Sequence, residues 1–124
     1  MPITFQIDPA RRWLEMKVAG VVTMEESAAS LRQLFAHPDY HDELCGLVDC
    51  REMTNLLSVT ELRRLADIQL TRPGPEWRSR RAVVVASPEH YGTARLFTVF
   101  AEASAVEFSI FYNYEAVLRW VQEF

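Results

Sequence analysis

Leu44-Cys-Gly-Leu-Val-Asp-Cys50 leads into Arg51-Glu-Met-Thr-Asn-Leu-Leu57 and then into Ser58-Val-Thr-Glu-Leu-Arg-Arg-Leu-Ala-Asp-Ile-Gln-Leu70. The first part is short and apolar, which predicts a strand covered on both faces at 44–48. The last part repeats apolar residues at helical spacing, which predicts an amphipathic helix. A strand, a connection and a helix in this order form the unit from which parallel sheets are built. Ligands and partners often meet such a unit at the carboxyl end of its strand.

The other strands follow from two patterns. Apolar residues alternate with polar ones in 3–7, 13–18 and 106–111, as in strands with one covered face. Ala82-Val-Val-Val-Ala86 is apolar throughout, as in a strand covered on both faces. Turn residues at 8–12 join the first two strands, which predicts an antiparallel hairpin at the N-terminus.

Capping residues indicate where the helices begin. Thr23 and Ser58 are each followed three positions later by a glutamate, and such a pair forms a capping box. Ser87 is followed by a proline, which favours the first helical position. Asn113 can cap a last helix. We therefore expect helices at 24–36, 58–70, 88–103 and 114–122.

The expected element order is β-β-α-β-α-β-α-β-α. This order predicts an α/β fold: a mixed, mostly parallel sheet of about five strands, with an N-terminal antiparallel hairpin, right-handed crossovers and four helices. The chain has 124 residues and shows no repeat and no long linker. We therefore expect a single domain over 1–124.

Composition limits the classes of protein. Hydrophobic residues make up 49% and charged residues 24% of the chain, as in an ordinary soluble globule. The net charge of -4 argues against nucleic-acid binding, which needs a basic face. No apolar run approaches the roughly 20 residues of a membrane helix, and no signal sequence is recognisable. Cys45 and Cys50 are five apart on one strand and point to opposite faces, which disfavours a disulfide, so we expect a cytoplasmic protein.

Three stretches carry a family resemblance. They are Leu47-Val-Asp-Cys-Arg-Glu-Met53 leading into Ser58, Arg81-Ala-Val-Val-Val85 with Tyr91-Gly-Thr-Ala-Arg-Leu-Phe97, and Val106-Glu-Phe-Ser-Ile-Phe111 with Glu115-Ala-Val-Leu-Arg-Trp120. With the element order, they resemble the STAS domain of sulphate transporters and anti-sigma-factor antagonists, and most closely its small bacterial SpoIIAA-like (STAS/SEC14-like) members. The resemblance implies a SpoIIAA-like fold and a non-enzymatic, regulatory domain that binds a protein partner. Its alternative implication is a small-molecule or lipid-binding module of the same fold.

The resemblance also gives Ser58 a role. In the anti-sigma-factor antagonists a serine at the start of this helix is phosphorylated, within Asp-Ser-(Ser/Thr)-Gly. Here the sequence reads Leu57-Ser58-Val59-Thr60. Ser58 is therefore either a phosphorylation site or a helix cap that needs no phosphate. The expected partner surface is the connection and helix start around it, namely Arg51, Met53, Thr54, Leu56, Leu57 and Thr60.

The sequence lacks a complete set of catalytic groups. Cys50 lies beside Asp49, whose charge would raise the pKa of the thiol, so we expect a structural cysteine and not a nucleophile. His37 and His41 lie near two carboxylates, but Pro38 breaks the helix that would place both imidazoles on one face. The four glycines are scattered, so the sequence contains neither the P-loop motif nor the glycine-rich dinucleotide-binding motif. We expect no catalytic residues, no metal and no cofactor.

Arginines are frequent on both sides of Trp77. Such a set could bind a phosphate, a lipid head group or an acidic partner, and Trp77 is the kind of residue that anchors an interface. The alternative is a solvated basic linker. The candidate residues for binding an anion or a partner are Arg63, Arg64, Arg72, Trp77, Arg78 and Arg80, with Arg81 next to them in the sequence.

The C-terminal half is rich in aromatic residues, most of which should be core. Any exposed remainder would indicate a homodimer face, and a pocket among them would indicate a small apolar or anionic ligand. An apolar cavity would favour ligand binding. A filled core with exposed Met53, Leu56 and Leu57 would favour a protein partner instead. The aromatic residues concerned are Tyr91, Phe97, Phe100, Phe108, Phe111, Tyr112, Tyr114 and Trp120.

Overall fold

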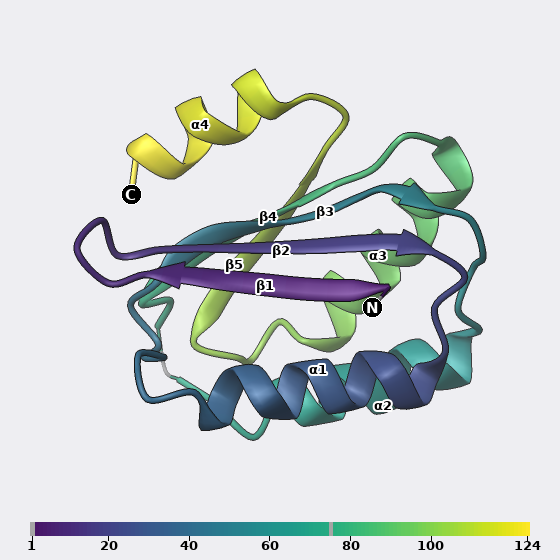
Figure 1. Ribbon diagram of the computed structural model, residues 1–124, viewed down its shortest axis with the longest axis horizontal. Coiled ribbons are helices and arrows are strands. Elements are labelled where there is room, and N and C mark those ends of the chain that lie inside the picture. The colour runs from purple at the N-terminus through teal and green to yellow at the C-terminus, as the bar shows by residue number, and fades with distance from the viewer. Residues whose placement is uncertain (1, 75) are drawn as a thin grey trace.

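The computed structural model describes residues 2–74 and 76–124, and this part of the chain forms five strands and four helices in the expected order. The strands are β1 (Ile3–Asp8), β2 (Trp13–Gly20), β3 (Cys45–Met53), β4 (Ser79–Val84) and β5 (Val106–Phe111). The helices are α1 (Met24–Ala36), α2 (Val59–Gln69), α3 (Pro88–Phe100) and α4 (Tyr114–Gln122) (Figure 1). The strands pair in chain order, with β1 antiparallel to β2 and the other neighbours parallel. The predicted fold class is confirmed.

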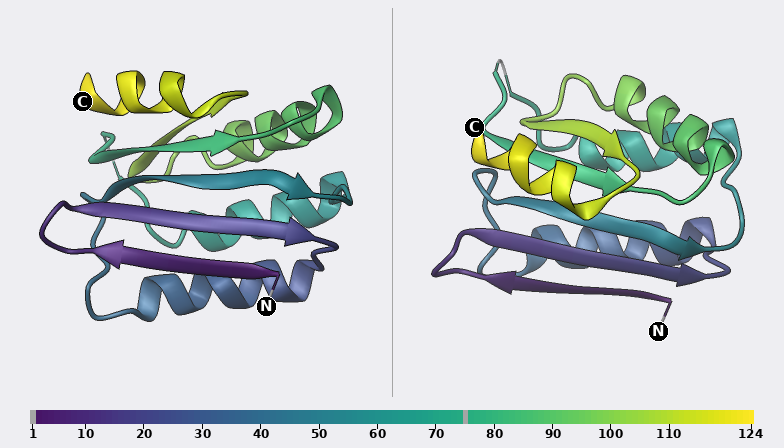
Figure 2. Two further views of the ribbon diagram at one scale, coloured as in Figure 1. Left: turned by 45° about the horizontal axis from the view of Figure 1, so that its top comes forward. Right: turned by 90° about the horizontal axis from the view of Figure 1, so that it is seen from above.

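Helices cover both faces of the sheet. The helices α1, α2 and α3 lie on one face and α4 lies on the other (Figures 1 and 2). Each of the first three connects two parallel strands that are neighbours in the sheet, and the strand order always advances in one direction. Right-handed crossovers in one direction place their helices on the same face, whereas α4 follows the last strand and is free to return over the opposite face.

The helix starts confirm the two predicted capping boxes. Thr23 Oγ1 accepts a hydrogen bond from the Glu26 amide at 3.1 Å, and Glu26 Oε1 accepts from the Thr23 amide at 3.0 Å. At the start of α2, Ser58 Oγ accepts from the Glu61 amide at 3.1 Å, and Glu61 Oε1 accepts from the Ser58 amide at 2.8 Å. Each box provides acceptors for amides that have no partner inside the helix.

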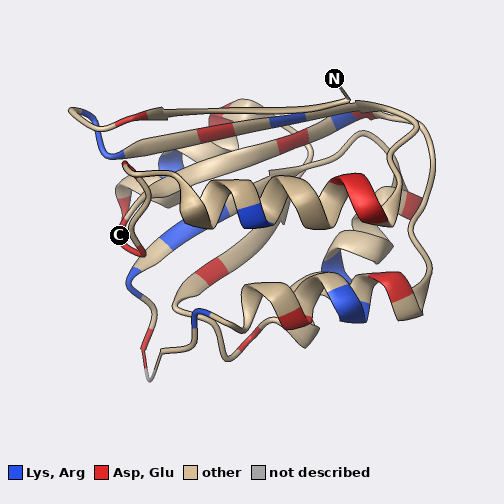
Figure 3. Cartoon of the chain, turned by 60° about the horizontal axis from the view of Figure 1, so that its bottom comes forward, with Lys and Arg blue, Asp and Glu red and all other residues tan. Residues whose placement is uncertain are grey.

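The outer surfaces of α1 and α2 are charged and their inner surfaces are apolar. Figure 3 shows both acidic and basic residues along the two helices. On the inner side, Ala28 and Leu34 of α1 and Leu62 and Ala66 of α2 are buried. This distribution is that of amphipathic helices resting on a sheet.

The sheet has two separate apolar faces. On the face toward α4, Leu47, Ala82 and Val84 pack with Val117 in one buried cluster. On the other face, residues of β4 such as Val83 point toward α1, α2 and α3. Because side chains alternate along a strand, neighbouring residues of β3 and β4 enter different environments.

Three elements differ most from the sequence prediction in their bounds. The strand β4 was expected at 82–86, but it spans Ser79–Val84, where it pairs with β5 over its whole length. The strand β3 was expected to end at Val48, but it continues to Met53 and pairs with β2 as far as Gly20. The long second strand of the hairpin offers ladder partners over this length, so residues 51–53 are strand and not connection. The helix α3 ends at Phe100, earlier than expected, because Ala101 already leaves the helical conformation.

Gly46 is confined by its neighbouring strand, and this generates a test. A Cβ atom at Gly46 would overlap the backbone of Leu14 on β2, whereas a Cβ at Gly92 on α3 would meet open space. We expect Gly46→Ala to lower the free energy of unfolding by about 1–3 kcal/mol through overpacking. We expect Gly92→Ala to raise it by about 0.5–1 kcal/mol, since alanine favours a helix over glycine. Urea denaturation measures both, and equal effects would contradict this account.

Candidate functional site

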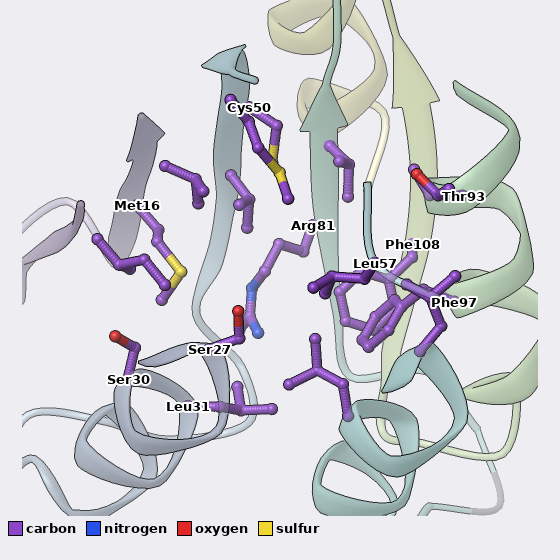
Figure 4. A pocket seen from close by; sticks show the side chains of 18 of the residues that line it. Met16, Ser27, Ser30, Leu31, Cys50, Leu57, Arg81, Thr93, Phe97 and Phe108 are labelled. Atoms are coloured by element: carbon purple, nitrogen blue, oxygen red, sulfur yellow. The ribbon is translucent and has the colours of Figure 1, made fainter. Parts of the chain in front are cut away.

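An apolar cavity of about 170 Å³ lies between the sheet and the helices α1, α2 and α3. Strands β1 to β5 and these three helices all contribute to its wall (Figure 4). The apolar wall includes Leu14, Met16, Val18, Val48, Leu62, Leu65, Val83, Phe97 and Phe108. Concave apolar sites with a few polar groups are the usual form of a small-molecule site. We name this space the inner cavity.

The Arg81 side chain extends from β4 into the inner cavity (Figure 4). Arg81 is 2% exposed. Its Cζ lies 5.9 Å from the ring centroid of Phe108 and 6.0 Å from that of Tyr40. Within the described residues no protein group accepts a hydrogen bond from Arg81 Nε or Nη2. Contact with an aromatic ring offsets only part of the cost of burying a cation.

A second buried donor belongs to the same cavity. Gln69, the last residue of α2, is 1% exposed and lines the inner cavity. Its Nε2 has no protein acceptor in the part of the chain that the structure describes. Buried polar atoms normally have a partner, so two such groups at one cavity require an explanation. We call Arg81 and Gln69 the buried donor pair.

The donor pair makes one end of the inner cavity polar. Arg81 is near the amino end of β4, and Gln69 ends the helix that precedes this strand. The sequence analysis expected a site at the carboxyl ends of the strands, and the donor pair lies nearer the opposite end. The signal for Arg81 was present in the sequence. It precedes an apolar strand and shares a face with Val83 and Val85, which predicts a buried side chain.

Two other polar residues of the wall, His90 and Ser27, are half-buried and have partners. The His90 ring lies between Ser87 Oγ, 2.7 Å from Nδ1, and the Asn55 carbonyl oxygen, 2.9 Å from Nε2. Both ring nitrogens are therefore engaged. Ser27 Oγ donates to the Thr23 carbonyl at 3.0 Å. These groups are satisfied within the protein, in contrast to the donor pair.

Cys50 also lines the inner cavity. Burial raises the pKa of its thiol to about 12, and the negative charge of Asp49 adds to this effect. The Asp49 carboxylate accepts hydrogen bonds from the Arg51 side chain at 2.9 and 3.0 Å, which lowers the pKa of Asp49 and keeps it ionised. The thiol therefore stays protonated near neutral pH and contributes an apolar surface to the wall.

The predicted partner surface divides between the cavity and the solvent. Met53 and Leu57 are half-buried and line the inner cavity. Leu56, which lies between them, is 47% exposed. Thr54 and Thr60 are exposed, and Arg51 is exposed beside Asp49. Ser58 caps α2, and its phosphorylation stays a prediction.

The arginines predicted as one binding set lie in separate environments. Arg72 pairs with Asp42, and Arg78 Nη1 lies 4.0 Å from the other oxygen of the same carboxylate. The remaining three of the predicted arginines lie elsewhere: Arg80 Nε is 2.9 Å from Glu107 Oε1, Arg63 lies 4.0 Å above the Phe100 ring, and Arg64 is exposed on α2.

Trp77 is 46% exposed in the connection before β4. The grouping of Arg81 with the surface arginines was wrong, because alternation along β4 turns it into the cavity. An anion-binding role of the surface set stays a prediction.

The expected aromatic pocket is mostly absent from the inner cavity. Of the eight aromatic residues named from the sequence, Phe97 and Phe108 line it. Phe111 and Trp120 pack with each other near α4, with ring centroids 5.5 Å apart. Most of the apolar wall is aliphatic, and it comes mainly from β1 to β4 and the helices α1 and α2.

Two further features follow from the described residues. Residues 2–74 and 76–124 contain no group of three or more His, Cys, Asp or Glu side chains placed to hold a metal ion. In the segment between α1 and β3, which holds His37 and His41, Asp42 pairs with Arg72, and the His37 ring packs edge-on against Phe5. None of the helices that the structure describes has the length and apolar character needed to cross a membrane.

Cys50 gives a test of the cavity wall. With a pKa of about 12, only about one thiol in ten thousand is ionised at pH 8. In a Cys45→Ser variant, we expect iodoacetamide to alkylate Cys50 at pH 8 far more slowly in the folded protein than in urea, as followed by mass spectrometry. Equal rates would contradict a protonated thiol shielded by the cavity wall.

The same shift makes stability depend on pH. The unfolded thiol ionises near pH 9 and the folded thiol only near pH 12. The folded state therefore retains a proton that the unfolded state loses, and this contribution to stability falls as the pH rises above 9. In urea denaturation, the free energy of unfolding of a Cys50→Ser variant should fall less steeply above pH 9 than that of the wild type.

Comparison with known proteins identifies the fold family by structure. No protein-family model matches the sequence. No curated protein matches it significantly either. In structure the chain is similar to an uncharacterized protein of the DUF3478 family with a SpoIIAA-like fold, from Shewanella loihica PV-4, with a TM-score of 0.63 and 20% identity over 96% of this chain and 93% of that one. A likeness at this identity shows the fold alone. The chain has a SpoIIAA-like fold, as the resemblance in sequence implied.

Proposed function

We propose that this domain works by binding and not by catalysis, and that it holds a small apolar molecule in the inner cavity. The observation that carries the proposal is the cavity itself, with about 170 Å³ between mostly apolar walls. An engineered apolar cavity of about 150 Å³ binds benzene. A ligand of roughly six to ten heavy atoms therefore suits the inner cavity. Among the alternatives for this fold, a small molecule fits better than a two-chain lipid, which is several times larger.

The chemistry of the wall supports binding without a reaction. The Cys50 thiol is a weak nucleophile because burial raises its pKa. The His90 ring has both nitrogens engaged by Ser87 and Asn55. Free thiols at Cys45 and Cys50, on opposite faces of the sheet, suit a reducing compartment, so a cytoplasmic location is part of the proposal.

Filling the cavity tests the proposal. Ala94 of α3 lines the inner cavity, whereas Ala29 of α1 is exposed. We expect toluene to shift methyl resonances of the wall residues in NMR spectra of the wild type. We expect Ala94→Leu to abolish these shifts, because the added carbons occupy the space of the ligand, and Ala29→Leu to leave them unchanged.

A second filling variant, Cys50→Leu, guards against a folding defect in the first. Circular dichroism checks that each variant is folded. The proposal fails if toluene does not bind to the wild type, or if it binds equally to folded Ala94→Leu and Cys50→Leu variants.

A protein partner is the second candidate, supported by exposed apolar residues around Ser58. Leu56 is 47% and Val59 57% exposed, and both lie in the stretch where the STAS resemblance places a partner. We expect the wild type to retain a host protein in pull-downs, and Leu56→Asp to lose it because a charge at an apolar contact is costly. Gln33→Asp, at an exposed polar position on α1 outside the expected partner surface, is the matched control. Retention of the same protein by Leu56→Asp would exclude this surface, and capture of a second copy would indicate a homodimer.

A further inference from the structure

The polar end of the inner cavity contains hydrogen-bond donors without protein acceptors. In the described part of the chain, Arg81 Nε, Arg81 Nη2 and Gln69 Nε2 have no protein partner. Arg81 and Gln69 are 2% and 1% exposed, so the bulk solvent does not satisfy them. A guanidinium keeps its positive charge in proteins. The cavity thus combines apolar walls with a fixed positive charge.

The surroundings leave this charge uncompensated by the protein. Among the residues that the structure describes, no carboxylate lies within ion-pairing distance of Arg81. Its neighbours in the same row of the sheet are Gly46 on β3 and Phe108 on β5. Gly46 places no side chain beside the guanidinium, and Phe108 offers only the face or edge of a ring. Arg80, the preceding residue, is directed to Glu107 near α4.

We infer that the inner cavity recognises a small monocarboxylate, an inference that rests on the proposed function. Arg81 and Gln69 hold its carboxylate, and the aliphatic and aromatic walls hold its hydrocarbon part. The planar guanidinium has parallel donors that match the two oxygens of a carboxylate. The side-chain amide of Gln69 supplies a further neutral donor.

Charge and size define the class of ligand. A single guanidinium balances one negative charge, which suits a monocarboxylate better than a dianionic phosphate ester. The cavity volume of about 170 Å³ suits a chain of about six carbons or a single aromatic ring. Hexanoate and benzoate represent these two shapes, and 1-hexanol and benzyl alcohol are their neutral counterparts.

Isothermal titration calorimetry of the intact chain at pH 7 tests the inference. We expect at least one of the two carboxylates to bind about tenfold or more tightly than its neutral counterpart, as a buried charge-assisted hydrogen bond predicts. An apolar cavity without a cation would show the reverse order, since the alcohols leave water more readily. Comparing hexanoate with benzoate then reports whether the ligand is linear or cyclic.

Variants assign the preference to particular residues. Arg81→Met should remove the preference for the carboxylate while binding of the alcohol persists, and Gln69→Leu should weaken the carboxylate severalfold. Arg32→Met, at an exposed arginine on α1 outside every predicted binding set, is the matched control and should bind as the wild type does. Thermal unfolding verifies that each variant is folded. If Arg81→Met does not fold, the comparison of carboxylate with alcohol binding by the wild type still tests the carboxylate inference.

The outcomes separate the two levels of proposal. Equal or tighter binding of the alcohols by the wild type would overturn the carboxylate inference and leave the apolar binding function in place. An unchanged preference for the carboxylate in Arg81→Met would overturn the role of Arg81. If toluene, the acids and the alcohols all fail to bind, the binding function itself is wrong.

Discussion

The alternation of side chains along a sheet covered on both faces determines where each residue of β3 and β4 lies. Arg80 and Arg81 are neighbours in sequence, yet Arg80 pairs with Glu107 and donates to the Trp120 carbonyl oxygen at 2.8 Å near α4. Arg81 points to the other face and into the inner cavity. A shift of pairing by one residue would exchange the two environments. Correct register of β4 between β3 and β5 is therefore a condition for the cavity, and not only for the fold.

The inner cavity stands in contrast to the face under α4. There, Leu47, Ala82, Val84 and Val117 form a filled cluster that contributes to stability. The opposite face keeps an unfilled volume and a buried cation, and both oppose folding, the first through lost contacts and the second through lost solvation. Proteins commonly keep such unfavourable features where a ligand binds, because binding supplies the missing contacts. The placement of both features in one cavity supports the proposal that the cavity binds a ligand.

Local patterns in the sequence were sufficient for the fold. The capping boxes at Thr23 and Ser58 and the doubly apolar strand at 82–86 each predicted an element that the structure contains. The sequence did not predict the end of β3, because its extension to Met53 depends on a pairing with β2 that no local pattern encodes. Strand ends are determined by the length of the neighbouring strand, which is a tertiary constraint.

The site was harder to predict, because a cavity is a property of packing. Arg81 was grouped with the surface arginines by sequence proximity, although its phase in the strand placed it with Val83 and Val85. Gln69 was placed on the apolar side of its helix with Leu62 and Leu65, but it was not singled out as a site residue, since a glutamine is usually exposed. The apolar walls look the same in sequence whether they enclose a cavity or fill a core. Only the volume left between sheet and helices distinguishes the two cases.

The connection after β3 links the two candidate functions of this domain. Met53 and Leu57 form part of the cavity wall, while Leu56 between them faces solvent. A partner bound at Leu56 would therefore rest on the outer side of the segment whose inner side touches a ligand. The fold is shared with a protein whose own function is uncharacterized, so the fold alone does not choose between these uses. The choice lies with particular side chains, and the buried guanidinium of Arg81 is the one that a protein-binding surface would not require.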